Sequence, residues 1–167
     1  MRFSRKLFLS LGLTVVAATT LLSSTENTAR ADSHIEPAIA AAITARQSQM
    51  RLYGFHLGQL GAMAKGKTPY DAGAATAAAN FLSGLSNLGS NAMWPQGSDN
   101  ESVDTTRALP ALWKEGSDVG VKSKALSDAT AAMAEAAAFD LASLQGAMGA
   151  VGEACKACHK AFRKPKD

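Results

Sequence analysis

The segment Cys155-Lys156-Ala157-Cys158-His159, close to the end of the 167-residue chain, decides the predicted fold class and function. Its pattern, Cys-x-x-Cys-His, is the attachment signature of a c-type haem. On a helix, Cys155 and Cys158 lie on one face, where both sulfurs can form thioethers to the same porphyrin edge, and His159 shares that face. The pattern therefore predicts one covalently attached haem c, with His159 as an iron ligand and any second axial ligand upstream.

Other roles of a Cys-x-x-Cys pair fit this chain less well. A zinc site requires four ligands, but the chain has two cysteines, and its other histidines, His34 and His56, are far away in sequence. A thioredoxin-like pair lies near a βαβ pattern, and no such pattern is visible. A disulfide would close only a very small loop and would leave His159 unexplained.

The first 31 residues have the pattern of a secretory signal peptide. Three basic residues within the first six precede the apolar stretch 7–22, and Ala29-Arg30-Ala31 supplies an A-x-A cleavage site. An uncleaved membrane anchor is the alternative, but the stretch is short for a span of about 20 residues. Because covalent haem attachment requires reduced thiols outside the cytoplasm, we expect export to the periplasm and no stable membrane insertion after cleavage.

Removal of residues 1–31 leaves 136 residues, 32–167, enough for one domain with its own hydrophobic core. This part carries 13 basic and 13 acidic side chains, whereas the formal charge of +3 belongs to the whole sequence. Haem propionates would make the balance slightly acidic. The charge therefore gives no support to nucleic-acid binding.

Basic residues nevertheless gather around the haem motif. A solvated basic helix end, favoured by the helix dipole, is one explanation. Docking of an acidic redox partner is the other. The cluster consists of Lys156, Lys160, Arg163, Lys164 and Lys166.

The sequence between the leader and the motif has the pattern of four helices. Alanine is abundant, runs of β-branched residues are missing, and Gly and Pro fall between long helical stretches. We expect helices over 37–65, 71–88, 110–139 and from Asp140, its N-cap, onward. Their short connections predict an all-α, antiparallel up-down-up-down four-helix bundle with covalently attached haem c. The exception is the long polar segment 89–109, which we expect to cover one haem edge.

Two of these helices carry three glycines each, at positions 54, 58 and 61 and at 146, 149 and 152. Each costs about 1 kcal/mol relative to alanine in a helix interior. Either a large cofactor or another backbone approaches these positions, or the helices simply pack closely there. The pattern does not separate the two explanations.

After the leader, the chain resembles the class II c-type cytochromes, the cytochrome c' family, over its whole length. The matching features are the haem motif in the last helix, followed by Phe162-Arg163, and Arg46-Gln47-Ser48-Gln49-Met50 in the first helix. The segments 64–72 and 110–113 are similar to the family's first interhelical turn and to the start of its third helix. A haem motif near the C-terminus is specific for this class, since class I cytochromes carry theirs near the N-terminus.

The resemblance implies roles for individual residues. Cys155 and Cys158 would hold the haem, with His159 as the proximal ligand. Arg163, one turn later, would be a cation near the proximal face, and Arg46 and Gln47 would contact propionates or the haem edge.

Arg46 also carries a signal of its own. Its spacing to Ile39, Ile43 and Met50 places it on the inward stripe of its helix, where an unpaired charge is costly. A haem propionate would be a counter-ion for this charge. The alternative is an arginine that extends its head group to water.

Met50 decides the chemistry, and the resemblance leaves its role open. A thioether ligand gives six-coordinate, low-spin iron with a raised potential, and this is the interpretation we favour. Alternatively, Met50 caps an open site on five-coordinate iron that binds NO or CO, or fills a gap in the core. Helix spacing does not choose between these roles. His56 and Met148, the other candidates, are expected not to bind iron.

The leading hypothesis is a periplasmic monohaem electron carrier that is not an enzyme, with unidentified redox proteins as partners. A protein that binds NO or CO is the second hypothesis. A weak peroxidase-like enzyme is the third, and it lacks support because no histidine neighbours Arg46. The resemblance also implies that the chain can form a homodimer through its first two helices.

Overall fold

The computed structural model describes residues 35–166, so the predicted leader, 1–31, lies outside the described residues. The α-helices of the described part are α1 (Pro37–Ala64), α2 (Ala72–Ser86), α3 (Val119–Ala136) and α4 (Leu141–Phe162). In this part of the chain, no helix is both long and apolar enough to cross a membrane.

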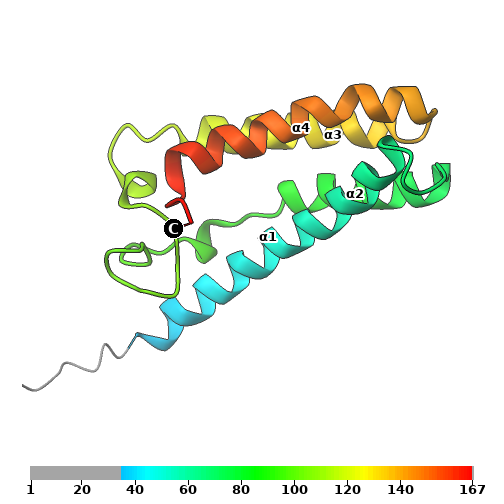
Figure 1. Cartoon of the computed structure of the whole chain (residues 1–167). Helices are drawn as coiled ribbons and strands as arrows, with labels where there is room; N and C mark the ends of the chain where they lie inside the picture. Colours follow the sequence, from blue (N-terminus) through cyan, green and yellow to red (C-terminus); the bar gives the residue numbers. More distant parts are fainter. Residues whose placement is uncertain (1–34, 167) are drawn as a thin grey trace, which may run out of the picture. The chain divides into compact units, whose positions relative to one another are not determined.

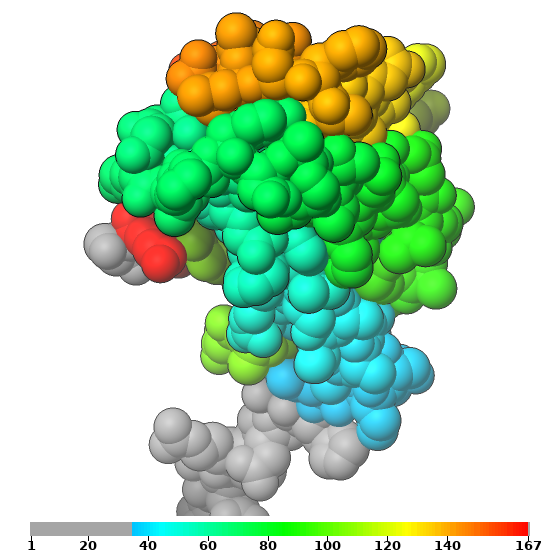
Figure 2. Space-filling model, turned by 90° about the vertical axis from the view of Figure 1, so that its right-hand side faces the viewer, coloured from blue at the N-terminus to red at the C-terminus, as the bar shows by residue number. Residues whose placement is uncertain are grey.

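The helices are arranged as an antiparallel bundle. Figure 1 shows α1 and α2 connected at one end, with α3 and α4 connected at the same end. In the space-filling view of Figure 2, α2 (green) lies between α1 (cyan) and the α3–α4 pair (yellow and orange). α3 packs extensively on α2 and α4, whereas α1 packs more extensively on α2 than on α4. The predicted up-down-up-down four-helix bundle is therefore confirmed.

Local signals explain where the helices begin and end. Pro37 is the first residue of α1, where its missing N–H costs nothing. α1 ends in a Schellman motif at Gly66, which has a φ of +66°, and the following N–H donates to Ala62 O at 2.8 Å. Asp140 is the N-cap of α4, as predicted, and its carboxylate accepts a hydrogen bond from the N–H of Ser143 at 2.8 Å.

The third helix is shorter than the sequence predicts. A 3-10 turn over Pro110–Trp113 is separated from α3 by five residues without helical structure. Lys114 in this gap is extended, and Gly116 has a φ of +76°. Both conformations interrupt the hydrogen-bond ladder of an α-helix. The predicted helical start at Pro110 is therefore present as a 3-10 turn, and the prediction of one continuous helix was wrong over 114–118.

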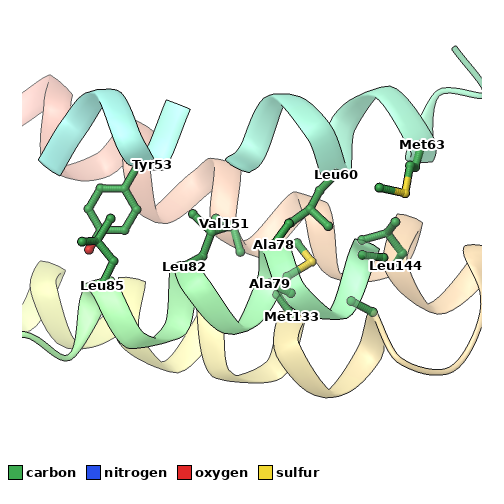
Figure 3. Packing of buried hydrophobic residues seen from close by; sticks show 12 residues of the cluster. Tyr53, Leu60, Met63, Ala78, Ala79, Leu82, Leu85, Met133, Leu144 and Val151 are labelled. Atoms are coloured by element: carbon green, nitrogen blue, oxygen red, sulfur yellow. The ribbon is translucent and has the colours of Figure 1, made fainter. Parts of the chain in front are cut away.

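The core lies between the four helices (Figure 3). Each helix contributes a fully buried side chain: Leu60, Leu82, Met133 and Leu144 from α1 to α4 in order. Burial of this apolar surface holds the bundle together. On α4, Leu144 and Val151 are buried, and residues 141, 148, 155 and 158 are half-buried.

Close packing within the described chain does not explain the helix glycines. A Cβ added to Gly61 would lie 3.7 Å from Cε of Met148, which is an ordinary contact. At positions 54, 58, 146, 149 and 152, an added Cβ would meet nothing within 4 Å. The close-packing interpretation was therefore wrong at five of these six positions.

The long segment between α2 and α3 lies at the end of the bundle where α4 ends (Figure 1). Ala108 of this segment pairs with Arg163 in an isolated antiparallel bridge. The N–H of Leu109 donates to Phe162 O at 2.9 Å. These bonds fasten the segment beside the haem motif, and its predicted place over a haem edge stays a prediction.

Candidate haem site

The Cys-x-x-Cys-His motif lies in the last turns of α4. Cys155 and Cys158 are half-buried free thiols, so no disulfide joins them. They are three residues apart on the helix and share a face, and Cys155 packs against the core. Burial raises the pKa of both thiols, and Cys155 raises that of Cys158 further. Among the described residues, no group of three or more His, Cys, Asp and Glu side chains could form a zinc site.

His159 is half-buried next to Cys158. Burial lowers the pKa of His159, and the charges of Arg163 and Arg107 lower it further. The neutral imidazole, which is the form that binds a metal, is favoured by this shift. Haem c requires two thiols that form thioethers to the porphyrin and one neutral imidazole that binds the iron. The helix presents these three groups on the same side, so the residues fit this cofactor.

Arg46 of α1 is 3% exposed, so the alternative in which its head group extends to water was wrong. Nη1 donates to Oγ of Ser98 at 2.7 Å and to Met93 O at 3.1 Å. Nη2 donates to Oγ1 of Thr106 at 2.8 Å and to Ser98 O. All four acceptors belong to the segment between α2 and α3, and together they engage every N–H of the two terminal nitrogens.

Two indole rings complete the surroundings of Arg46. Its Cζ lies 4.6 Å from the ring centroid of Trp94 and 6.0 Å from that of Trp113. Nε1 of Trp113 donates to Trp94 O at 2.9 Å. Burial lowers the pKa of Arg46, and Asp99 partly offsets this effect. The segment is thus folded around a buried cation, and the predicted contact with propionates stays a prediction.

Gln47 and Met50 follow Arg46 on the same helix. Nε2 of Gln47 donates to Thr105 O at 2.7 Å, which adds a further bond between α1 and the segment. Met50 is 41% exposed and lies outside the core. The interpretation of Met50 as a residue that fills a gap in the core was therefore wrong.

Tyr53 of α1, which no prediction from the sequence singled out, belongs to the same core cluster as the haem motif. It is 7% exposed and belongs to the core against which Cys155 packs. Burial, and after it Cys155, raises the pKa of Tyr53 to about 12. Tyr53 and Cys155 therefore pack on the same core cluster. The spacing of seven residues between Arg46 and Tyr53 is helical, so periodicity could have found Tyr53.

A hydrogen bond sets the register of two antiparallel helices, since Nε2 of Gln145 in α4 donates to Ala64 O in α1 at 2.7 Å. α1 and α4 run in opposite directions (Figure 1). Met50 lies fourteen residues back along α1 from Ala64, and His159 lies fourteen residues onward along α4 from Gln145. At 1.5 Å per residue, both steps lead about 21 Å toward the same end of the bundle. Met50 and His159 therefore lie at similar levels on neighbouring helices.

His56 and Met148, the other candidate iron ligands, contact different groups. The ring of His56 stacks on Phe81, with centroids 4.1 Å apart, and meets Phe55 edge-on at 5.1 Å. Met148 packs against the core. Neither residue is placed by these contacts beside His159.

The fold and the site together define a four-helix-bundle c-type haem protein, and comparisons with known proteins agree. The family model described as Cytochrome C' matches residues 41–163. The chain is 43% identical to cytochrome c-554 of Cereibacter sphaeroides over 122 residues, 73% of this chain and 80% of that protein. It is 36% identical to the cytochrome c' of the same bacterium over 121 residues, 72% and 81% of the two chains. The solved cytochrome c' from Rhodobacter sphaeroides superposes with a TM-score of 0.74 at 34% identity, covering 77% and 98%.

The chain belongs to the cytochrome c' family. The resemblance inferred from the sequence is confirmed, and haem c is the cofactor of this family, with which Cys155 and Cys158 are consistent. The roles of Arg46, Gln47 and Arg163 toward the haem stay predictions.

We expect Arg46→Lys to lower the free energy of unfolding by about 2–4 kcal/mol, because an ammonium group lacks the planar fork and leaves buried acceptors unpaired. Urea unfolding measures the loss, and hydrogen exchange of amides 93–108 should accelerate. The control is Arg51→Lys on the exposed side of the same helix, with an effect below about 0.5 kcal/mol. Equal effects of the two substitutions would show that the segment does not depend on Arg46.

The raised pKa of Tyr53 predicts a loss of stability in alkaline solution. Its phenol titrates at 10.0 in the unfolded chain and at about 12 in the folded protein. The stabilisation is therefore complete below pH 10 and is lost as the pH rises toward 12, and Tyr53→Phe should remove this dependence. Tyrosine-selective NMR of Tyr70→Phe, which retains Tyr53 as its only tyrosine, reads the titration directly. A midpoint near 10 would contradict the prediction.

Proposed function

We propose that the protein is a periplasmic single-haem electron carrier and not an enzyme. Cys155 and Cys158 would hold the haem through thioethers, with His159 as the proximal ligand and Met50 as the sixth ligand. Haem c supplies a one-electron couple between ferric and ferrous iron. The observation that carries this proposal is the similar level of Met50 and His159 on neighbouring helices, which follows from the hydrogen bond between Gln145 and Ala64 O.

The state of each side chain supports this assignment. The thioether of Met50 is not committed to the core, so it can bind iron without repacking the bundle. The lowered pKa of His159 favours the ring form that binds iron. Arg46 uses its terminal N–H groups on the segment between α2 and α3, so they are not free to assist proton transfer in peroxidase-like catalysis.

The periplasmic location rests on the sequence and on the relatives. The signal-peptide pattern of residues 1–31 would direct export. The matching proteins come from bacteria such as Cereibacter sphaeroides. Attachment of haem to free thiols takes place outside the cytoplasm, which agrees with the signal-peptide pattern and with the bacterial relatives.

Binding of a gas at an open coordination site is the second candidate function. A solved structure that superposes with a TM-score of 0.68 at 35% identity is the nitric oxide complex of a mutant cytochrome c prime from Alcaligenes xylosoxidans. In this alternative, the exposed side chain of Met50 would cover the open site instead of binding iron.

Optical spectra distinguish the two candidates. For the electron carrier we expect low-spin spectra, a thioether charge-transfer band near the red edge in the ferric state, and no change on addition of CO. Met50→Leu keeps an apolar side chain of similar size but removes the sulfur, so it should give high-spin spectra that shift with CO. The matched control, Met148→Leu, should leave the spectra unchanged. A high-spin, CO-sensitive spectrum of the unaltered protein would overturn Met50 ligation.

The outer face of α1 and α2 supports a homodimer. Leu52, Phe55 and Phe81 are 40%, 61% and 42% exposed. Phe55 and Gly58 line a hollow of about 450 Å³, and a Cβ added to Gly58 would meet no described residue within 4 Å. Exposed apolar groups of this kind mark interaction surfaces. A solved cytochrome c' described by its ligand-controlled dimer dissociation superposes with a TM-score of 0.70 at 29% identity.

We expect Phe55→Glu to weaken dimerisation by a factor of about ten or more, because it replaces an apolar contact with a charge that must be desolvated. Sedimentation velocity over a range of concentrations measures the dissociation constant. Phe139→Glu, at a phenylalanine that is 77% exposed between α3 and α4, is the control and should leave dimerisation unchanged. A protein that is monomeric at all concentrations would contradict this proposal.

A further inference from the structure

A surface rich in cations surrounds the end of α4. This basic surface consists of Lys156, Lys160, Arg163, Lys164, Lys166 and Arg107. Arg107 is half-buried, and the other five side chains are exposed. The positive charge of these side chains favours a negatively charged partner.

The fold adds Arg107 to a cluster that the sequence already contains. The N–H of Lys164 donates to Arg107 O at 2.8 Å, and Nη2 of Arg107 donates back to Lys164 O. Next to this pair, Ala108 bridges to Arg163. A cation from the segment between α2 and α3 is thereby held beside the cations of the C-terminal tail.

Nearby acidic groups leave most of this charge without a partner. In the stretch 153–167, five side chains are basic and two, Glu153 and Asp167, are acidic, and the contact of Glu153 with Lys156 is 3.5 Å long. No other cation of the basic surface forms an ion pair within the described residues. On α3, by contrast, Lys122 and Lys124 pair with carboxylates at 2.6 and 2.7 Å. Since residues 32–167 carry equal numbers of acids and bases, this surface is a local asymmetry.

The basic surface is also hollowed. Arg107, Lys164 and Lys166 line a recess of about 410 Å³ together with the polar side chains of Asn100 and Thr106. Asp104 is the one acid in this lining, and it is exposed to solvent. The recess is large enough to receive carboxylate side chains from another protein.

The position of the basic surface connects it with the haem motif. Lys156 and Lys160 flank the motif in sequence, the N–H of Arg163 donates to His159 O at 3.1 Å, and Arg107 is bonded to the next residue, Lys164. A partner bound here would therefore lie next to the proximal side of the predicted iron site. Proteins that exchange electrons use weak, charged interfaces of this kind, since charge speeds encounter and permits rapid release.

We propose that the basic surface is the docking site of an acidic redox protein, whose carboxylates enter the recess between the tail and residues 100–107. This inference rests on the proposed electron-carrier function. In the docked pair, one electron would leave the ferrous iron and reduce the oxidised one-electron centre of the partner, without transfer of a proton or an atom. A protein is favoured over a nucleic acid because the mature chain has no net positive charge to attract a polyanion.

The test uses the holoprotein and a gold surface coated with a carboxylate-terminated monolayer as the probe for an acidic partner. Lys160→Glu combined with Lys164→Glu reverses two charges whose side chains form no ion pair with described residues. The matched control is Lys65→Glu with Lys67→Glu, which makes the same charge change in the exposed α1–α2 turn at the opposite end of the bundle (Figure 1). Absorption spectra and thermal unfolding verify that both variants are folded.

At low ionic strength, where the Debye length is about 30 Å, we expect adsorption of the Lys160/Lys164 variant to fall at least about tenfold. The Lys65/Lys67 variant should adsorb within about twofold of the unaltered protein, and salt near 1 M should abolish the difference. Equal losses in the two variants would overturn the proposal. So would stronger, Lys160/Lys164-dependent binding to phosphatidylglycerol vesicles, because it would identify a membrane as the occupant. A microbalance measures adsorption, and a mediated redox titration measures the ferric/ferrous couple of the haem. Failure of docking and failure of the electron-carrier proposal are therefore distinguishable.

Discussion

The buried charge of Arg46 is the constraint on which the site depends. A guanidinium with 3% exposure is tolerated only when hydrogen-bond acceptors surround it, and the segment between α2 and α3 supplies four oxygens and two indole faces. Thr106 is one of these acceptors, and two residues later Ala108 bridges to Arg163. The conformation that satisfies Arg46 therefore also anchors the tail after α4, beside the haem motif.

The second constraint is the register of α1 against α4. Helices packed in an antiparallel bundle can slide along each other unless specific side chains interlock. Here Gln145 donates to Ala64 O, Met148 lies against Gly61, and these contacts bring Met50 and His159 to similar levels. The same register places Arg46 farther toward the end where the tail and the segment meet. Iron ligation, burial of the cation and attachment of the segment are thus linked through one helix pair.

Features that depend on local chemistry were predictable from the sequence. The haem motif, the start of α1 at Pro37 and the cap of α4 at Asp140 are all determined by neighbouring residues. The prediction of one continuous helix from Pro110 was wrong near Gly116. Helix-forming residues flank Gly116, but its backbone has a φ of +76°, which interrupts the helix. No local signal could pair Arg46 with Ser98, because 52 residues separate them and the acceptors lie in an irregular segment.

By itself, the sequence determined that this chain is a four-helix bundle bearing a c-type haem motif in its last helix, because helix periodicity, caps and motif spacing act over a few residues. Tertiary structure decided which groups meet across the bundle. It surrounded Arg46 with neutral acceptors, packed Tyr53 and Cys155 on one core cluster and brought Arg107 to the tail. These contacts join residues that are far apart in the chain, and their geometry follows from helix packing and the burial of charge, which no short stretch of sequence encodes.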